Sequence, residues 1–383
     1  MRKSFFAVFL LLVTTFISCN KNNGNEIVRM TISDSTFINL IEYETKSILV
    51  GESISNKPLC SQIALINDKE KYLMMDNGYI YIFDWESGML EDSITTESCG
   101  NLNNYSGFRY ASEDSIYIYN YQTNRFFIIS SNGEIIKQVK ILENENPVEN
   151  AHICALNITP IYHCDSMFLL SGYMPGGLSM AKGMKIPAST MLDIESGRNK
   201  PIAYYPDLYT EHNWGTIYMN TVGITTDNKR NILYSFAITP HVYKYNADFT
   251  KCDTFYMQTR YDKGTKPAMN SIDELENNVE HEIKYYTSHT TYAEILYDTY
   301  RNCYIRVAEH PMMWKSAKES FAKPISLITA NDKGEVISET AIIKRGTTLI
   351  TNNMHICRAG LAIAKESGDE NIILFNCYKI GDI

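Results

Sequence analysis

The sequence lacks the local motifs by which many catalytic sites are identified. It contains no G-x-S-x-G elbow, no H-E-x-x-H zinc pair, no P-loop and no G-x-G-x-x-G after a strand-like segment. Hydrolases, metallopeptidases and nucleotide-binding enzymes of those types are therefore excluded. An enzyme on this chain would have to assemble its site from residues that lie far apart in the sequence.

Positive charge is also scarce. The chain has 35 Lys and Arg residues against 44 Asp and Glu residues, and its formal net charge is −9 at pH 7. No nucleic acid partner is expected, because such partners need a basic surface. An acidic chain is also poorly suited to lying flat on an anionic membrane, so membrane attachment would have to come from a lipid.

Closely spaced cysteines are absent. Apart from Cys19 there are eight cysteines, and no two of them have C-x-x-C spacing, so a structural metal is not expected. Most lie in apolar runs, as Cys154 and Cys377 do. This favours buried thiols that pack as small hydrophobes, with one or two disulfides as the alternative in an oxidising compartment.

The N-terminus carries a targeting signal. A basic start is followed by an apolar run from Phe5 to Ile17 and then by a small residue and Cys19. The run is too short to remain across a bilayer, so residues 1–18 are predicted to be a signal peptide. Cys19 has the place of a bacterial lipobox cysteine, which is lipidated and becomes the new N-terminus. Residues 19–25 would then form a short lipidated tether.

Short segments in which β-branched and aromatic residues alternate fill the remainder of the chain. Tyr79–Asp84 and Ser115–Asn120 are examples, and the polar residues that flank them complete a strand pattern. One motif recurs, in which an apolar strand enters a tight polar turn and a second strand leaves it. The turn residues are Gly88, Gly133, Gly197 and Gly334, with Asp248 in the equivalent place.

Each of these hairpins follows another pair of predicted strands, so the repeating unit has four strands. Stacked four-stranded units predict an all-β fold, the β-propeller. We expect six blades in a single domain over residues 26–383, with seven blades as the alternative. The last unit lacks one strand, and Glu26–Ile32 is expected to complete it and close the ring.

Two segments depart from the strand pattern. Ser271–Lys284 has helical apolar spacing and a start that resembles a capping box, and Trp314–Phe321 predicts a second short helix. Insertions of this kind lie on one face of a repeat fold and frequently bind ligands.

Four histidines are expected at one mouth of the central channel. Each lies at or just before a predicted innermost strand, and innermost strands begin on the same face of a propeller. If the imidazoles converge there, they suit zinc, copper or iron, or proton transfer. The favoured alternative is that each one separately caps a strand or bonds to neighbouring backbone. The four are His152, His212, His289 and His355.

Arg109 and Tyr105 of the second blade are expected at the same mouth, together with Trp214 beside the second histidine. Trp214 is the best single candidate for a sugar or peptide platform. Other aromatic residues could contribute or could fill contacts between blades, namely Trp85, Trp314, Tyr204, Tyr205, Tyr209, Tyr285 and Tyr286.

Two oxygen-rich clusters, Asp76–Gly78 and Asp227–Asn231, resemble calcium-binding segments in composition. They lack the spacing of an EF-hand loop, so turns are favoured over calcium sites.

A lipobox cysteine followed by six degenerate units with Asn-Gly or Ser-Gly turns resembles the six-bladed propeller lipoproteins of Gram-negative bacteria. The likeness is to the TolB-like propellers of the family called domain of unknown function 4221, and it covers the mature chain. The resemblance implies a propeller in the cell envelope, anchored in the outer membrane, and carries over no catalytic residue. In this group surface export favours acidic residues after the lipid cysteine. Residues 20–25 have none, so the periplasmic face is preferred.

The sequence therefore predicts a lipid-anchored propeller that binds or scaffolds a glycan, peptide or protein partner without catalysis. The alternative is a metal-dependent propeller hydrolase or lyase that uses the histidines of the channel mouth. The sequence assigns no cofactor.

Overall fold

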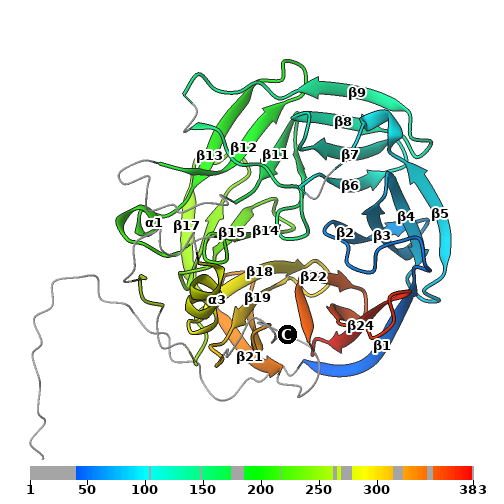
Figure 1. The fold of residues 1–383 in the computed structure, drawn as a ribbon. Coiled ribbons are helices and arrows are strands. Elements are labelled where there is room, and N and C mark those ends of the chain that lie inside the picture. The colour runs from blue at the N-terminus through cyan, green and yellow to red at the C-terminus, as the bar shows by residue number, and fades with distance from the viewer. Residues whose placement is uncertain are drawn as a thin grey trace, which may run out of the picture. The chain divides into compact units, whose positions relative to one another are not determined.

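In the computed structural model, the described residues form six antiparallel sheets of four strands each (Figure 1). The structure describes residues 40–102, 105–146, 149–173, 185–215, 217–261, 265–268, 278–313, 322–342 and 348–381.

Five of the sheets are each built from four consecutive strands. Blade 1 consists of β2 (Ser61–Ile66), β3 (Lys69–Asp76), β4 (Tyr79–Asp84) and β5 (Leu90–Thr95). Blade 2 consists of β6 (Gly107–Ser112), β7 (Ser115–Asn120), β8 (Arg125–Ile129) and β9 (Ile135–Lys140). Blade 3 consists of β10 (Tyr162–Cys164), β11 (Met167–Ser171), β12 (Pro187–Asp193) and β13 (Asn199–Tyr204). Blade 4 consists of β14 (Val222–Thr226), β15 (Ile232–Phe236), β16 (His241–Tyr245) and β17 (Cys252–Tyr256). Blade 5 consists of β18 (Thr291–Asp298), β19 (Cys303–Glu309), β20 (Ile325–Asn331) and β21 (Val336–Ile342).

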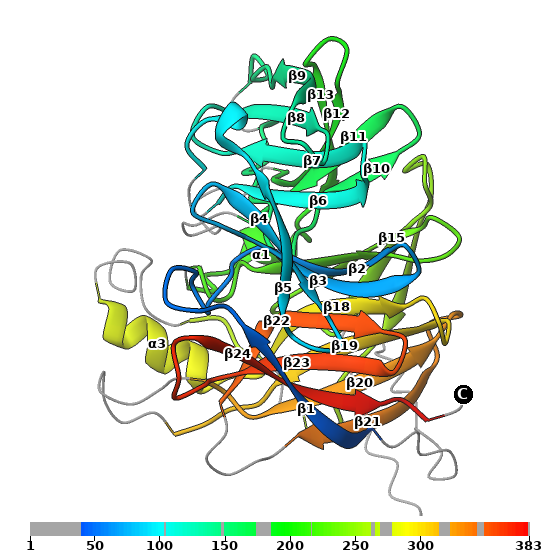
Figure 2. The same ribbon diagram turned by 90° about the vertical axis from the view of Figure 1, so that its right-hand side faces the viewer.

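The sixth blade joins the two ends of the propeller. Its strands are β22 (Leu349–Cys357), β23 (Gly360–Lys365), β24 (Ile372–Lys379) and β1 (Ile41–Leu49). β1 runs antiparallel to β24 along the outer edge, from Ile41 opposite Lys379 to Leu49 opposite Ile372 (Figure 2). The predicted six blades and the closure by an N-terminal strand are confirmed. The closing strand is Ile41–Leu49, however, and not Glu26–Ile32, which lies outside the described residues.

Both faces of each blade are buried against its neighbours, which explains the composition of the strands. In β7, Ile116 and Ile118 pack into a cluster shared with blade 1, whereas Tyr117 and Tyr119 pack into a cluster shared with blade 3. Alternate residues of a strand point to opposite faces of its sheet. A strand between two blades is therefore apolar on both faces, and in β7 the aliphatic residues lie on one face and the aromatic residues on the other.

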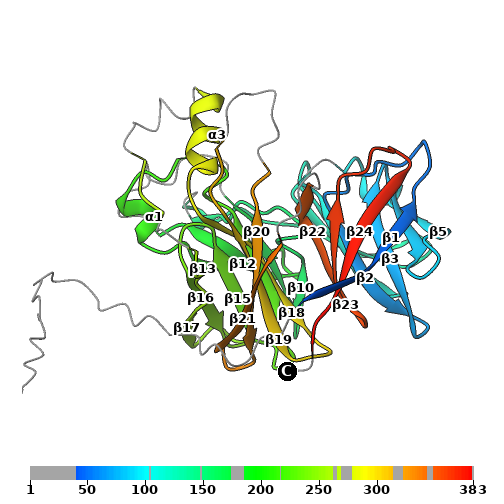
Figure 3. The same ribbon diagram turned by 90° about the horizontal axis from the view of Figure 1, so that it is seen from below.

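The helices are short. α1 covers Leu208–Glu211, and α3 covers Val279–Thr287 on one face of the ring (Figure 3). Asn278 caps α3, because its side chain accepts a hydrogen bond from the His281 N–H. The helix expected over Ser271–Lys284 thus extends further toward the C-terminus, and its expected capping box lies outside the described residues, as does Trp314–Phe321. No helix in the described part of the chain combines the length and apolar character needed to cross a bilayer.

The eight cysteines of the described residues are all free thiols. Six are buried, while Cys164 is half-buried and Cys252 is exposed. The interpretation as small buried hydrophobes therefore holds for six of them, and the blades are held together by packing instead of by disulfides.

The four predicted turn glycines have positive φ, between +71° and +86°. They share a second property, because a Cβ on any of them would collide with the outer strand of the preceding blade. Gly88 illustrates both constraints. Its carbonyl accepts the Leu49 N–H of β1 (2.9 Å), and an added Cβ would meet the Ser47 carbonyl oxygen of that strand. In blade 4 the left-handed position is held by Phe249 (φ +58°), one residue after Asp248.

We expect Gly88→Ala to lower the free energy of unfolding by about 2–4 kcal/mol, because it adds both a positive-φ penalty and a collision with β1. Gly78→Ala is the matched control. Gly78 also has positive φ (+80°), but no other atom lies within 4 Å of its added Cβ. The control should lose only about 1–2 kcal/mol. Urea unfolding of both variants measures the difference. Equal losses in the free energy of unfolding would show that the contact with β1 does not restrict the side chain at position 88.

Candidate functional site

A pocket of about 800 Å³ lies at the centre of the ring, and all six blades or the loops that enter them contribute to its lining. Leu59 precedes β2, Tyr105 precedes β6, Thr221 precedes β14 and Thr348 precedes β22. The pocket therefore lies at the face where the innermost strands begin. This is also the face that carries α3, since Ile283 of that helix is part of the lining. A cavity of this size can hold a small ligand.

Residues Cys154–Thr159, the cross-channel segment, pass through the middle of the ring. Asn157 donates its backbone N–H to the Leu59 carbonyl at blade 1 (3.2 Å). The Ile158 carbonyl accepts the N–H of Ile224 in blade 4 (2.9 Å). Blades 1 and 4 face each other across a ring of six, so a segment bonded to both must cross its centre. The segment also forms part of the pocket lining.

The side chain of Asn157 ties the segment to two innermost strands. Its Oδ1 accepts the N–H of Ser61 in β2 (2.6 Å), and its Nδ2 donates to the Asn352 carbonyl in β22 (2.7 Å). A glycine leaves space for the segment on another blade, because a Cβ at Gly107 of β6 would collide with the Ala155 carbonyl oxygen. Cys154 of the segment also donates its N–H to the Ser171 carbonyl of β11 (2.9 Å), so the cross-channel segment is held by blades 1, 2, 3, 4 and 6.

This arrangement corrects the interpretation of His152–Leu156. His152 was expected at or just before an innermost strand, but in blade 3 that strand is β10 (Tyr162–Cys164), which begins ten residues later. The run is apolar because it is buried at the ring centre, where burial by surrounding blades selects the same residue types as burial in a sheet.

An ion pair forms part of the pocket wall at blade 5. Glu309 ends β19, and its Oε2 accepts hydrogen bonds from the hydroxyls of Tyr286 and Thr291 (both 2.7 Å). Lys323 lies just before β20, with its Nζ 2.6 Å from the Thr291 hydroxyl and 3.9 Å from the Glu309 carboxylate. Burial lowers the pKa of Lys323 to about 8, although the nearby carboxylate opposes this shift. Both charged groups are thus partnered within the wall.

Glu294 of β18 is different. It lines the pocket and its side chain is buried, with a residue exposure of 2%. Its Oε2 atom has no hydrogen-bond partner among the described residues. Burial raises the pKa of Glu294 well above its usual range and so favours the neutral carboxyl. Leaving a buried polar atom unpaired costs about 1–3 kcal/mol, so such a group is a candidate for ligand contact.

Four tyrosines complete the wall of the pocket. Tyr218 and Tyr286 are stacked, with 5.1 Å between ring centroids and 25° between planes. Tyr105 and Tyr173 lie at blades 2 and 3. Aromatic rings with polar edges can stack on a ligand and also bond to it.

The four histidines do not meet. Three of them lie in separate environments beside aromatic rings. His152 packs against Tyr121 and against Tyr105 of the pocket wall, His212 against Trp214 and His289 against Tyr285.

His355 is buried within β22, where its Nε2 lies 2.8 Å from Asn353 Oδ1 and 3.1 Å from the Ser61 hydroxyl. Burial, assisted by the Arg109 guanidinium, lowers the pKa of His355 to about 3, so the imidazole is neutral. Within the described ranges there is no group of three or more His, Cys, Asp or Glu side chains that could hold a metal. The metal-dependent alternative therefore gains no support from these residues.

Of the remaining predicted site residues, only Tyr105 lines the pocket. The Arg109 guanidinium lies 6.0 Å from the ring centroid of Tyr162 in blade 3. Trp214 is buried and donates its indole N–H to the Leu208 carbonyl (2.7 Å), so its ring is not an open platform. Among the other aromatic candidates, Tyr286 lines the pocket, Trp85, Tyr205 and Tyr209 are buried, and Trp314 lies outside the described residues.

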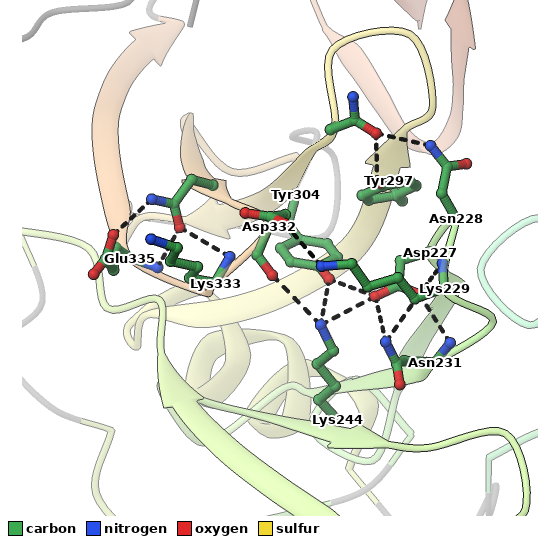
Figure 4. A network of polar contacts seen from close by, with 12 residues as sticks. Asp227, Asn228, Lys229, Asn231, Lys244, Tyr297, Tyr304, Asp332, Lys333 and Glu335 are labelled. Atoms are coloured by element: carbon green, nitrogen blue, oxygen red, sulfur yellow. Dashed lines mark hydrogen bonds and ion pairs between the residues drawn. The ribbon is translucent and has the colours of Figure 1, made fainter.

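The carboxylate of the Asp227–Asn231 turn binds the Lys244 ammonium group, so its oxygens are not available to a calcium ion (Figure 4). The Asp227 carboxylate lies 3.0 Å from Lys244 Nζ and accepts the Tyr304 hydroxyl (2.7 Å), which joins blades 4 and 5. In the Asp76–Gly78 turn, the Asp76 carboxylate accepts hydrogen bonds from the Ser55 N–H and from Asn77 Nδ2. Both segments are turns, as favoured.

Glu294, Glu309, Lys323 and Asn157 are not among the residues predicted from the sequence. One signal was available, because Glu294 is the acidic residue inside the otherwise apolar run of residues 292–297. A charged residue is seldom fully buried without a partner, so its presence in a predicted innermost strand indicates a site.

Comparison with known proteins identifies the relatives of the chain. The model of the family described as domain of unknown function (DUF4221) matches residues 37–334. The crystal structure of a DUF4221 member from Bacteroides vulgatus ATCC 8482 is 20% identical, covers 90% of this chain and 99% of its own, and has a TM-score of 0.74. The crystal structure of a putative exported protein from Bacteroides fragilis NCTC 9343 is 11% identical, covers 92% of this chain and 97% of its own, and has a TM-score of 0.51. None of the curated proteins matches the chain.

We expect Glu294→Gln to stabilise the protein increasingly as the pH rises above 5. The folded state raises the pKa of this carboxyl, so the unfolded chain loses the proton at a lower pH than the folded chain does. Stability contributed by the neutral carboxyl is therefore lost as the pH rises from the unfolded pKa toward the folded one, by up to about 1.4 kcal/mol per pH unit. Glutamine cannot ionise and should lack this decline.

Urea unfolding between pH 5 and pH 9 measures the effect, with Glu195→Gln as the control, because the Glu195 side chain is 79% exposed. If the two variants follow the same pH dependence relative to the wild type, Glu294 is not held neutral.

Proposed function

The chain belongs to the DUF4221 family, and we propose that it is a non-catalytic binding module that holds a short glycan or peptide in its central pocket. One observation carries the proposal: the cross-channel segment and the tyrosines form a pocket whose wall contains the Glu294 carboxyl, and its Oε2 has no hydrogen-bond partner in the described part of the chain. Pockets that bind small ligands combine apolar and aromatic walls with a few placed polar groups. A protein partner would use the same face by inserting a segment into the pocket.

The other polar groups of the wall favour binding over catalysis. Glu309 is hydrogen-bonded by Tyr286 and Thr291 and neighbours Lys323, so it is engaged in holding the wall. A general base must instead be placed to take a proton from the substrate. The histidines of the metal-dependent alternative lie in separate environments, so they do not support a metal-dependent hydrolase or lyase.

We also propose that the protein is exported and anchored to the outer membrane by a lipid on Cys19, on the periplasmic face. The basic start, short apolar run and cysteine at the N-terminus support this location. The similar structure from Bacteroides fragilis is that of a putative exported protein, which agrees with it.

We expect Tyr218→Ala to weaken ligand binding about tenfold, since it removes an aromatic face from the pocket wall. The mature chain with Cys19→Ser, which carries no lipid, would be screened against oligosaccharide and short-peptide arrays, and hits would be measured by calorimetry. Tyr79→Ala is the control, because Tyr79 lies on β4, away from the pocket lining. The proposed function fails if the arrays give no hits, or if hits bind both variants equally.

We expect Cys19→Ser to move the protein from the membrane fraction to the soluble fraction, because the only proposed anchor is the lipid on this residue. Fractionation and metabolic labelling with a fatty acid would measure the change. Protease treatment of intact cells tests the face, and digestion of the wild-type protein there would contradict the periplasmic assignment.

A further inference from the structure

The carboxyl of Glu294 needs a partner that the described residues do not supply. It sits on the innermost strand of blade 5 and lines the pocket, yet its Oε2 is unbonded among the described residues and the residue is only 2% exposed. Buried polar groups are nearly always bonded, so an exception in a pocket wall requires an explanation. A ligand group that bonds to the carboxyl would supply one.

The charge of the wall indicates the sign of that ligand group. Among the described residues that line the pocket, Glu294, Glu309 and Glu366 are acidic and Lys323 is the one cationic residue. The ionised acidic residues outnumber Lys323 by one when Glu294 is neutral, and by two once Glu294 ionises. The whole chain is acidic as well, so a cationic ligand would be attracted and an anionic one repelled.

The tyrosines favour a cation for a second reason. The face of an aromatic ring carries negative charge and attracts ammonium groups. The wall already contains one such contact, because Lys323 Nζ lies 4.2 Å from the ring centroid of Tyr286. The Lys323 side chain is fully buried there, so its alkyl stem is accommodated as well as its charge. A lysine-like chain thus has the shape and charge that this wall accepts.

We propose that the pocket binds a short peptide through a primary ammonium group, as on a lysine side chain, which forms an ion pair with Glu294 between the tyrosine rings. This inference rests on the proposed binding function and specifies its ligand. Burial in the empty pocket favours the protonated form of the Glu294 carboxyl. On binding, that proton leaves to solvent, the carboxylate pairs with the ammonium, and the charge balances.

The surrounding groups set the pH range in which this can be tested. Tyr162 of β10 interacts electrostatically with Glu294, and Arg109 of β6 lies over the Tyr162 ring. Lys323 and Glu309 belong to the same wall. Because the pKa of Lys323 is about 8, measurements between pH 5 and pH 7 keep that residue cationic throughout.

The test uses the mature chain with Cys19→Ser and two blocked tripeptides that differ only in acetylation of a central lysine side chain. We expect the free lysine peptide to bind at least tenfold more tightly, with an affinity that rises from pH 5 to pH 7. Calorimetry in buffers of different ionisation enthalpy should show proton release. Glu294→Gln should abolish both the preference and the release, whereas Glu195→Gln should retain them.

Three outcomes would overturn the inference while the array screen still supports a binding function. The two peptides could bind equally, or not at all. Affinity could fall as the pH rises, which would show that the protonated carboxyl donates to a neutral ligand. A glucosamine trisaccharide could bind with the same pH dependence where the peptides do not, which would assign the ammonium to a sugar.

Discussion

The fold depends on the hydrogen bonding of a backbone segment that crosses the centre of the ring. Buried N–H and C=O groups must be paired, and the cross-channel segment meets this requirement on the innermost strands of opposite blades. Asn157 bonds to Leu59, Ser61 and Asn352, while Ile158 bonds to Ile224. The same bonds place residues of this segment in the wall of the central pocket. The interaction that stabilises the ring centre therefore also creates the only feature that we assign to binding.

Most of the propeller could be predicted from local patterns, because strands and tight turns are determined by nearby residues. Gly88 and Gly334 were correctly placed in turns that need positive φ. Their contact with the neighbouring blade could not be predicted, since it depends on how blades stack. The closing strand was expected at residues 26–32, whereas it is Ile41–Leu49. Ring closure requires one strand from the N-terminus, and the pattern alone does not say which segment supplies it.

The site was harder to predict, for a physical reason. Whether a side chain faces the channel depends on the register of its strand. An error of a few residues in the predicted start of the strand therefore places the side chain in a different environment. His355 was expected at the channel mouth, but it is buried within β22 against Ser61 and Asn353. Tyr105 was placed correctly because it directly precedes an innermost strand. The acidic Glu294 in an apolar strand was a signal in the sequence, but whether its Oε2 finds a partner among the described residues is known only from the folded structure.

Two buried ionisable residues of blade 5, Arg306 and Glu294, differ in the hydrogen bonds that the described residues make to them. The difference separates a residue that stabilises the fold from one that is available to a ligand. Arg306 is fully buried on β19, and its guanidinium donates to Ser235 Oγ (2.8 Å) and to the carbonyls of Pro240 (2.7 Å) and Thr239 (2.8 Å). Such a group has its bonds whether or not a ligand is present, so it stabilises blades 4 and 5 at all times. Glu294, one strand away, has no equivalent set among the described residues. A buried carboxyl oxygen without a partner destabilises the protein, and a ligand group that bonds to it in the pocket would offset that cost.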